Sequence, residues 1–281
     1  MKNTRILFSS DVHLCHFDWC GRSSEERMDN MIRQMNEYYD EKPYEMVVFL
    51  GDYSLDHWKW QIKGSWLEQG INNTERFIRE YVSRLKVPSY LMPGNHEQYG
   101  DEMWKKMTGG PRQGYFTVGG YLVICCDNYA KELDPDYHHD GVYTVTDLDF
   151  VRKVMAQNPQ LPVILCGHNF DQDKEPEEFY AFLKEEKRIV LLMCGHDHIT
   201  EIHDMGEKAD HVCVVYDGHY AYPGMKRSVQ STMWGFCDAV LSDEGVDIRY
   251  VEPENDIMID GAPYHHEYRE QNHRFFKRRD L

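Results

Sequence analysis

Residues 189–198 read IVLLMCGHDH, an apolar run of six residues followed at once by Gly195, His196 and His198. Six consecutive apolar residues, without alternation, are typical of a strand that is buried on both faces. The same change from a short apolar run to Asp, Asn or His recurs at residues 6–13, 46–52, 88–97 and 163–168. Longer amphipathic segments separate these runs, and this alternation predicts an α/β protein.

The other elements follow from the same kind of pattern. Helices are expected over residues 23–39 with Ser24 as the cap, after Asn73 or Thr74, after Thr146, and around residues 176–186. A hairpin is expected over residues 115–127, and residues 212–216 and 235–251 are rich in strand-forming residues. No repeat interrupts this order, so one domain is predicted over residues 1–251. Residues 252–281 form a polar C-terminal extension in which a helix can form around residues 265–279.

The polar motifs at the strand ends are expected to meet, because the carboxyl ends of strands in an α/β sheet form the crevice that binds ligands. Pooled, they supply Asp11, His13, Asp52, Asn95, His96, His168, His196 and His198. A single His beside a Gly is usually a turn residue, but five such motifs together indicate a site. Imidazoles and oxygen ligands without a thiolate suit Mn, Fe, Zn, Co or Ni rather than Ca or Cu(I).

The number of candidate ligands indicates two metal ions. Asp11 and His13 lie two positions apart at a strand end and so face the same side, and His196 and His198 repeat this spacing. With Asp52 between the two pairs, and with Asn95 and His168 completing the second ion, the set describes a two-metal hydrolytic centre.

Charge and composition limit the possible partners. The chain has 31 Lys and Arg residues against 48 Asp and Glu residues, a formal net charge of −17. This excess of carboxylates disfavours a long nucleic-acid-binding groove or an anionic membrane surface. The longest apolar runs have six residues, and the N-terminal run Ile6-Leu7-Phe8 is too short for a signal peptide. The eight cysteines contain no C-x-x-C pair, so reduced, buried thiols in a cytoplasmic protein are expected.

The five motifs, in this order, resemble those of the calcineurin-like metallophosphoesterase superfamily, D-x-H, G-D, G-N-H-[DE], G-H and G-H-x-H. The blocks here begin at Asp11, Gly51, Gly94, Gly167 and Gly195, and the resemblance spans residues 6–198. It implies a four-layer αββα sandwich, in which two facing mixed β-sheets are flanked by helices. It also implies that residues 1–251 are a metallophosphoesterase catalytic domain.

The resemblance further implies a role for each site residue. Asp11, His13 and His198 would hold the first of two divalent or trivalent ions, Asn95, His168 and His196 the second, and Asp52 would bridge them. His96 would stabilise the phosphorane and protonate the leaving oxygen, so that His96 and Asp52 are the catalytic residues. The implied reaction is hydrolysis of a small phosphomonoester or phosphodiester by in-line attack of a metal-bridging hydroxide.

Departures from the family pattern indicate which branch of the superfamily the chain resembles. Protein Ser/Thr phosphatases continue the second block as G-D-x-x-D-R-G, whereas this chain reads GDYSLDH over residues 51–57 and has no Arg there. The compact pattern resembles the bacterial branch of small phosphodiesterases. Two alternatives stay open, a nuclease of the same superfamily, which the charge disfavours, and a catalytically silent metal-binding scaffold.

Three further features have two readings each. His16 and Arg22 are expected either to contact a substrate phosphate or to lie in a solvated loop. The aromatic residues of segment 53–75 form either a lid or part of the core; they are Tyr53, Trp58, Trp60 and Trp66, with His57 among them. The basic C-terminal tail contacts substrate or another subunit, or is simply solvated. The sequence leaves the physiological substrate, the native metals and the oligomeric state open.

Overall fold

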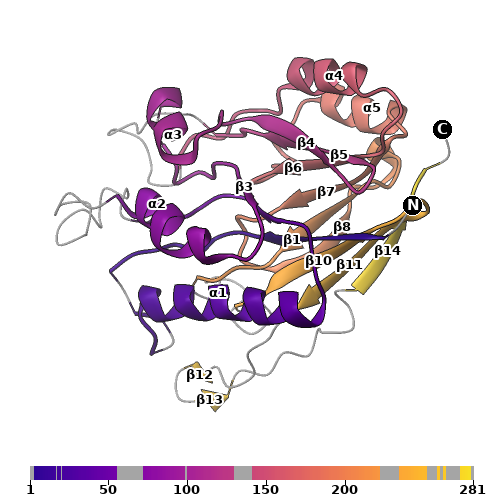
Figure 1. The fold of residues 1–281 in the computed structure, drawn as a ribbon. Helices are drawn as coiled ribbons and strands as arrows, with labels where there is room; N and C mark the ends of the chain where they lie inside the picture. The colour runs from indigo at the N-terminus through magenta and orange to yellow at the C-terminus, as the bar shows by residue number, and fades with distance from the viewer. Residues whose placement is uncertain are drawn as a thin grey trace.

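A computed structural model describes residues 3–16, 18–19, 21–55, 72–98, 100–129, 141–221, 234–251, 258–259, 262–263 and 273–279. Two six-stranded sheets face each other, and helices lie on their outer sides (Figure 1). This is the predicted αββα arrangement of two mixed sheets flanked by helices.

The first sheet has the strand order β14-β11-β10-β1-β2-β3. Its strands are β1 (Thr4–Ser9), β2 (Val47–Phe49), β3 (Ser89–Leu91), β10 (Phe236–Leu241), β11 (Gly245–Val251) and β14 (His273–Lys277). β1, β2 and β3 are parallel, whereas β10, β11 and β14 continue the sheet from β1 by antiparallel pairing. The carboxyl ends of the three parallel strands therefore lie at the same end of the sheet.

The second sheet has the strand order β4-β5-β6-β7-β9-β8. Its strands are β4 (Gly114–Val118), β5 (Tyr121–Cys126), β6 (Val163–Gly167), β7 (Ile189–Cys194), β8 (Thr200–Asp204) and β9 (Cys213–Asp217). β5, β6, β7 and β9 are parallel, with β4 and β8 antiparallel at the two edges. A short separate pair is formed by β12 (Met258–Ile259) and β13 (Ala262–Pro263).

Helices cover the outer faces. They are α1 (Ser24–Glu41), α2 (Asn73–Arg76), α3 (Asp101–Thr108), α4 (Leu148–Gln157) and α5 (Glu177–Glu185), with a π-helix at Phe77–Tyr81 and 3₁₀ turns at Val82–Arg84 and Glu207–Ala209. α1 runs below the first sheet in Figure 1, and α4 and α5 lie above the second. None of the described helices combines the length and apolar composition that a membrane span requires.

Alternation along each strand divides the core into layers. In β1, Ile6 and Phe8 point between the sheets, where they pack in one cluster with Ile164 of the second sheet. Leu7, which lies between them in the chain, packs outward with Met31 of α1. Successive side chains of a strand point to opposite faces, so a continuous apolar run serves both layers.

The start of α1 differs from prediction by one residue. Ser23 is the N-cap, because its hydroxyl accepts from the Glu26 amide while the Glu26 carboxylate accepts from the Ser23 amide. Ser24, the predicted cap, accepts a hydrogen bond from the Cys15 amide. The other two predicted caps shift similarly, to Asn72 for α2 and to Asp147 for α4.

The helix expected around residues 265–279 is wrong for residues 273–277, which form β14 and pair with β11. Phe276 points between the two sheets and is buried, whereas Phe275 is exposed, as alternation in a strand requires. Arg279 then anchors the chain, since its guanidinium donates to the Leu183, Glu186 and Ile189 carbonyls. β14 thus completes an edge of the first sheet.

The seven described cysteines are all buried free thiols. Burial raises the pKa of the Cys166 and Cys194 thiols well above the usual range, so these side chains behave as small apolar groups. The eighth, Cys20, lies outside the described residues.

Candidate metal centre

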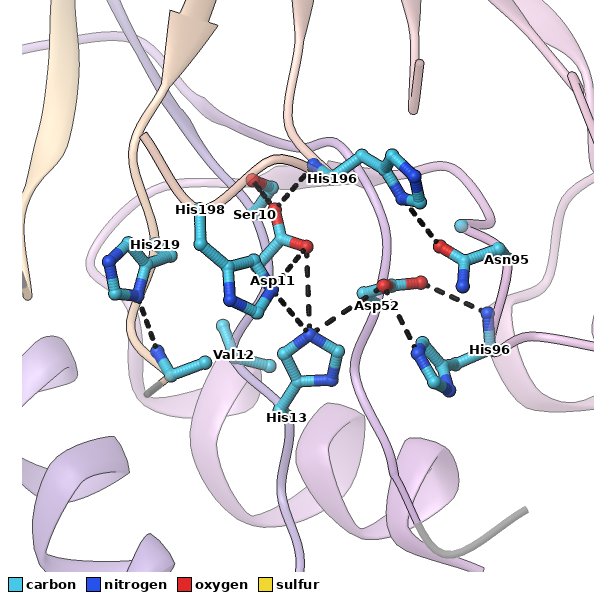
Figure 2. Close-up of polar contacts among 12 residues, drawn as sticks. Ser10, Asp11, Val12, His13, Asp52, Asn95, His96, His196, His198 and His219 are labelled. Carbon is cyan, nitrogen blue, oxygen red and sulfur yellow. Dashed lines mark hydrogen bonds and ion pairs between the residues drawn. The ribbon is translucent and has the colours of Figure 1, made fainter. Parts of the chain in front are cut away.

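All eight predicted site residues lie where the carboxyl ends of β1, β2 and β3 of the first sheet meet those of β6 and β7 of the second. Figure 2 shows the side chains of Asp11, His13, Asp52 and His198 pointing toward one another, with Asn95 and His96 beside them. The prediction that these motifs converge is thus matched by the geometry. Within each sheet the parallel strands deliver their following residues to the same end, and the facing of the two sheets brings the two sets together.

The backbone at these strand ends has an unusual conformation. Five of the predicted ligands have positive φ, namely Asp11 at 48°, His13 at 45°, Asp52 at 60°, His196 at 72° and His198 at 52°. Residues other than glycine rarely adopt this left-handed region, and each instance costs about 1–3 kcal/mol. Backbone hydrogen bonds hold these turns against one another, since the Asp11 amide donates to the Gly51 carbonyl at 3.0 Å and the His13 amide to the Asp52 carbonyl at 3.1 Å.

Asp11, His13 and His198 form one group of ligand atoms. Asp11 Oδ1 lies 3.3 Å from His198 Nε2 and 3.6 Å from His13 Nε2, and the two imidazole nitrogens are 3.0 Å apart. The Asp11 side chain is fully buried, and among the described residues its Oδ1 has no hydrogen-bond partner. A buried carboxylate oxygen without a donor, facing two imidazoles, fits a cation.

Asp52, His168 and His196 form a second group. Asp52 Oδ2 lies 3.2 Å from His168 Nε2, and Asn95 Oδ1 lies 2.9 Å from His168 Nε2 and 3.0 Å from His196 Nδ1. His168 Nδ1 is 2.7 Å from the Leu50 carbonyl, to which it donates, so Nε2 is the nitrogen directed at the group.

Asp52, a member of the second group, also approaches the first. Its Oδ2 is 3.6 Å from His13 Nε2 and 3.6 Å from His96 Nε2, and its Oδ1 accepts a hydrogen bond from the His96 amide at 3.0 Å. One carboxylate therefore reaches a residue of the first group, a residue of the second and His96.

The two histidines of the second group have pKa values shifted in opposite directions by their surroundings. Burial lowers the pKa of His168, but the Asp52 carboxylate opposes this effect and raises that pKa to about 10. Burial and the neighbouring His168 lower the pKa of His196 to about 4. Burial raises the pKa of the Asp11 carboxyl, but His198 and His13 outweigh it and hold this pKa well below the usual range. The metal-free centre thus concentrates two carboxylates and a protonated His168, a charge arrangement that a divalent cation can replace.

Glu97 has a supporting role that its place in the sequence motif did not reveal. Its buried carboxylate accepts hydrogen bonds from the Asp52, Tyr53 and Gly94 amides, each at 2.8 Å. The side chain thereby joins the turn after β2 to the turn after β3. Burial, with a contribution from Asp52, raises the pKa of Glu97 to about 7.

Sequence reasoning missed Ser10, Asp217 and His219. Asp217 is the last residue of β9 and His219 lies two positions after it, so the rule that was applied to the other strand ends would have found them. His219 is buried and stacks on His198, with ring centroids 5.1 Å apart. Tyr129 was also missed, and its hydroxyl lies 3.4 Å from His196 Nε2.

The aromatic segment is only partly described. Tyr53 belongs to the core, because it is fully buried, stacks on Phe77 at 5.2 Å and donates to the Met92 carbonyl at 2.7 Å. His57, Trp58, Trp60 and Trp66 lie outside the described residues. Arg22 lies over the Trp234 ring, 5.1 Å from its centroid.

A cavity of about 560 Å³ is linked to the second ligand group through Tyr129, although none of the eight site residues lines it. Tyr129, which contacts His196, forms one wall, and Arg112 forms another. Arg112 makes a bidentate ion pair with Asp127 and donates to the Glu97 carbonyl at 2.7 Å. The cavity has room for a small organic group next to the site.

The structure resembles solved structures of distant sequence. The purple acid phosphatase PPD1 from yellow lupin seeds aligns with a TM-score of 0.54 at 12% identity, covering 94% of this chain and 53% of the lupin chain, so this chain spans about half the length of that protein. GAP50, described as the anchor in the inner membrane complex of Plasmodium, aligns with a TM-score of 0.57 at 12% identity, covering 99% and 90%. At such low identities, these structural alignments show a shared fold alone. No curated protein matches the chain.

The sequence identifies the family more specifically than the structural alignments do. A family model described as calcineurin-like phosphoesterase matches residues 4–200, which include all eight site residues. This match confirms the family that the five motifs indicated. The chain therefore belongs to the calcineurin-like phosphoesterase family.

Proposed function

We propose that this protein hydrolyses a small phosphomonoester or phosphodiester at a centre of two metal ions. The observation that carries the proposal is that Asp52, a member of the second ligand group, also approaches His13 of the first group and His96. Asp11, His13 and His198 would hold one ion, Asn95, His168 and His196 the other, and Asp52 would contact both. The donor set favours Mn, Fe, Zn, Co or Ni.

Bound ions would supply positive charge that lowers the pKa of a coordinated water and polarises the phosphoryl oxygens. The protein residues contribute orientation and proton transfer. Water attacks phosphorus on the side opposite the leaving oxygen and releases one proton to solvent as the new P–O bond forms. The P–O bond to the leaving oxygen breaks, and His96, as the general acid, delivers a proton to that oxygen. The His96 amide bond to Asp52 fixes the start of this side chain relative to the ligand groups.

The substrate is small rather than polymeric. A net charge of −17 disfavours long polyanions, which supports an ester over a nucleic acid. The cavity beside Tyr129 supplies space for the organic part of such an ester. Seven buried free thiols suit a reducing compartment, and we place the protein in the cytoplasm on that ground.

The test combines metal analysis with turnover of p-nitrophenyl phosphate and its bis-ester under Mn, Fe, Zn or Ni. Asp52→Asn should lower the occupancy of both ions and abolish most turnover, whereas His96→Ala should keep both ions and lose turnover. His211→Ala, which alters an exposed histidine paired with Asp204, is the control and should match the wild type. An Asp52→Asn protein with two ions and full activity would refute the assignment.

The same experiment addresses the two alternatives. Two bound ions without hydrolysis of either ester under any of the metals would favour the catalytically silent scaffold. Turnover of single-stranded oligonucleotides at rates above those of the two small esters would favour the nuclease.

A further inference from the structure

The two oxygens of the Asp11 carboxylate have different surroundings. Oδ1 faces His13 and His198, as described above. Oδ2 faces away from them, accepting a hydrogen bond from the His196 amide at 2.8 Å and one from the Ser10 hydroxyl (Figure 2). The carboxylate is thereby held with a single oxygen directed at the first ligand group.

Ser10 also contacts a second carboxyl group. Its Oγ lies 2.6 Å from Asp217 Oδ1, and the three side chains of Ser10, Asp11 and Asp217 are fully buried. A hydroxyl has one proton and can donate it to only one of two carboxyl oxygens. The second short contact therefore requires a proton on the other partner, with Ser10 Oγ as the acceptor.

The proton belongs on Asp217. Asp11 faces two imidazoles and would face a cation, all of which favour its ionised form. Asp217 Oδ2, by contrast, has no hydrogen-bond partner among the described residues, and an ionised carboxylate in that position would be desolvated without compensation. Burial accordingly raises the pKa of the Asp217 carboxyl well above its usual range.

Close packing leaves this chain of hydrogen bonds little freedom. Gly195 lies against it, because a Cβ at this position would overlap the Ser10 hydroxyl and come within 2.5 Å of Asp11 Oδ2. Gly195 also precedes His196, whose amide is the other donor to Asp11. The motif glycine thus gives the Ser10 hydroxyl access to Asp11.

We propose that Asp217 and Ser10 are positioning residues, in which the Asp217 carboxyl donates to Ser10 and Ser10 donates to Asp11, so that Asp11 Oδ1 is aimed at the first metal ion. This proposal rests on the proposed metal centre. The role requires a donor at position 217, not a negative charge, so an amide there should serve as well as a carboxyl group. An apolar side chain of similar size should not.

The experiment measures Mn²⁺ binding by isothermal titration calorimetry of the metal-free protein and its variants, with circular dichroism to confirm folding. Ser10→Ala and Asp217→Leu should weaken one of the two Mn²⁺ sites about 10- to 100-fold and leave the other unchanged, which is the range for partners of metal ligands. Asp217→Asn should bind within about threefold of the wild type. The control is Ser9→Ala, which removes a buried hydroxyl that has no hydrogen-bond partner among the described residues.

The outcomes separate this inference from the proposed function. A wild-type protein that binds no Mn²⁺ would overturn the metal centre itself. A wild type with two sites and a folded Ser10→Ala protein with the same two affinities would overturn the positioning pair alone. If Ser10→Ala does not fold, the two Asp217 variants decide, and an Asp217→Asn protein as weak as Asp217→Leu would refute a donor role for Asp217. A Ser10→Ala/Asp217→Leu double variant should be no weaker than Ser10→Ala.

Discussion

Replacing Asp52 by Asn should remove much of the pH dependence of the metal-free protein's stability. Asp52 Oδ2 lies 3.2 Å from His168 Nε2, and both side chains are buried. Burial alone would lower the pKa of His168, so the rise to about 10 depends on this carboxylate and, to a smaller extent, on Asp11. The Asp52→Asn substitution keeps the shape of the side chain and removes its charge.

The size of the effect follows from proton linkage. The pKa of His168 rises from 6.5 to about 10 on folding, and each unit corresponds to about 1.4 kcal/mol. Because the folded-state pKa is the higher one, this stabilisation is complete below pH 6.5 and is lost as the pH rises toward 10. The free energy of unfolding of the metal-free wild type should therefore fall by up to about 4 kcal/mol between pH 6.5 and 9.5. Water entering the empty centre will reduce this upper bound.

Urea unfolding in excess chelator, at pH 6.5, 8.0 and 9.5, measures this slope directly. Asp52→Asn should flatten it by at least half. Asp247→Asn is the control, because Asp247 also pairs with a histidine, His273, at 2.7 Å, but at an exposed position. Its slope should match that of the wild type. Equal slopes for Asp52→Asn and the wild type would refute the coupling of His168 to Asp52.

Three further substitutions test the support of the site and of the sheet. Glu97→Leu leaves three buried amides without an acceptor and should lower the free energy of unfolding by about 3 kcal/mol or more, measured by urea denaturation; an unchanged midpoint would contradict the role of Glu97 as a clamp. Gly94→Ala places a methyl group against the Asp52 carboxylate, so the folded variant should lose more than tenfold in activity and metal content, and full activity would argue against close packing there. Arg279→Ala removes three hydrogen bonds to carbonyls and should cost about 1–3 kcal/mol in urea, whereas the exposed Lys277→Ala should cost under about 0.5; equal effects would count against the anchor.

The convergence of the site could be predicted because it depends on local sequence and one topological rule. Each motif follows an apolar run, and the parallel strands of an α/β sheet end together. The motifs also carried the resemblance that predicted two facing sheets. His196 follows β7 of the second sheet and Asn95 follows β3 of the first, so predicting their contact also required the two facing sheets that the resemblance implied.

Contacts between distant segments could not be predicted in the same way. Ser10 and Asp217 are 207 positions apart, and their contact depends on how the two sheets face each other. Ser24 resembled a helix cap in sequence, but the tertiary contact with the Cys15 amide uses its hydroxyl, and the adjacent Ser23 caps α1. Residues 273–277 form a strand because the edge of β11 is available for pairing, which local periodicity does not reveal.

The left-handed backbone of the five candidate ligands affects the order in which segments of the molecule unfold locally. At about 1–3 kcal/mol each, these conformations store energy that the surrounding hydrogen bonds and, in the proposed metal-bound state, the cations must balance. Removing the proposed cations would take away one of these two restraints at the site and leave the apolar layers intact. Amide hydrogen exchange in chelator should therefore accelerate first in the turns after β1, β2 and β7, while the middle of β5 and β6 keeps the protection of the whole domain.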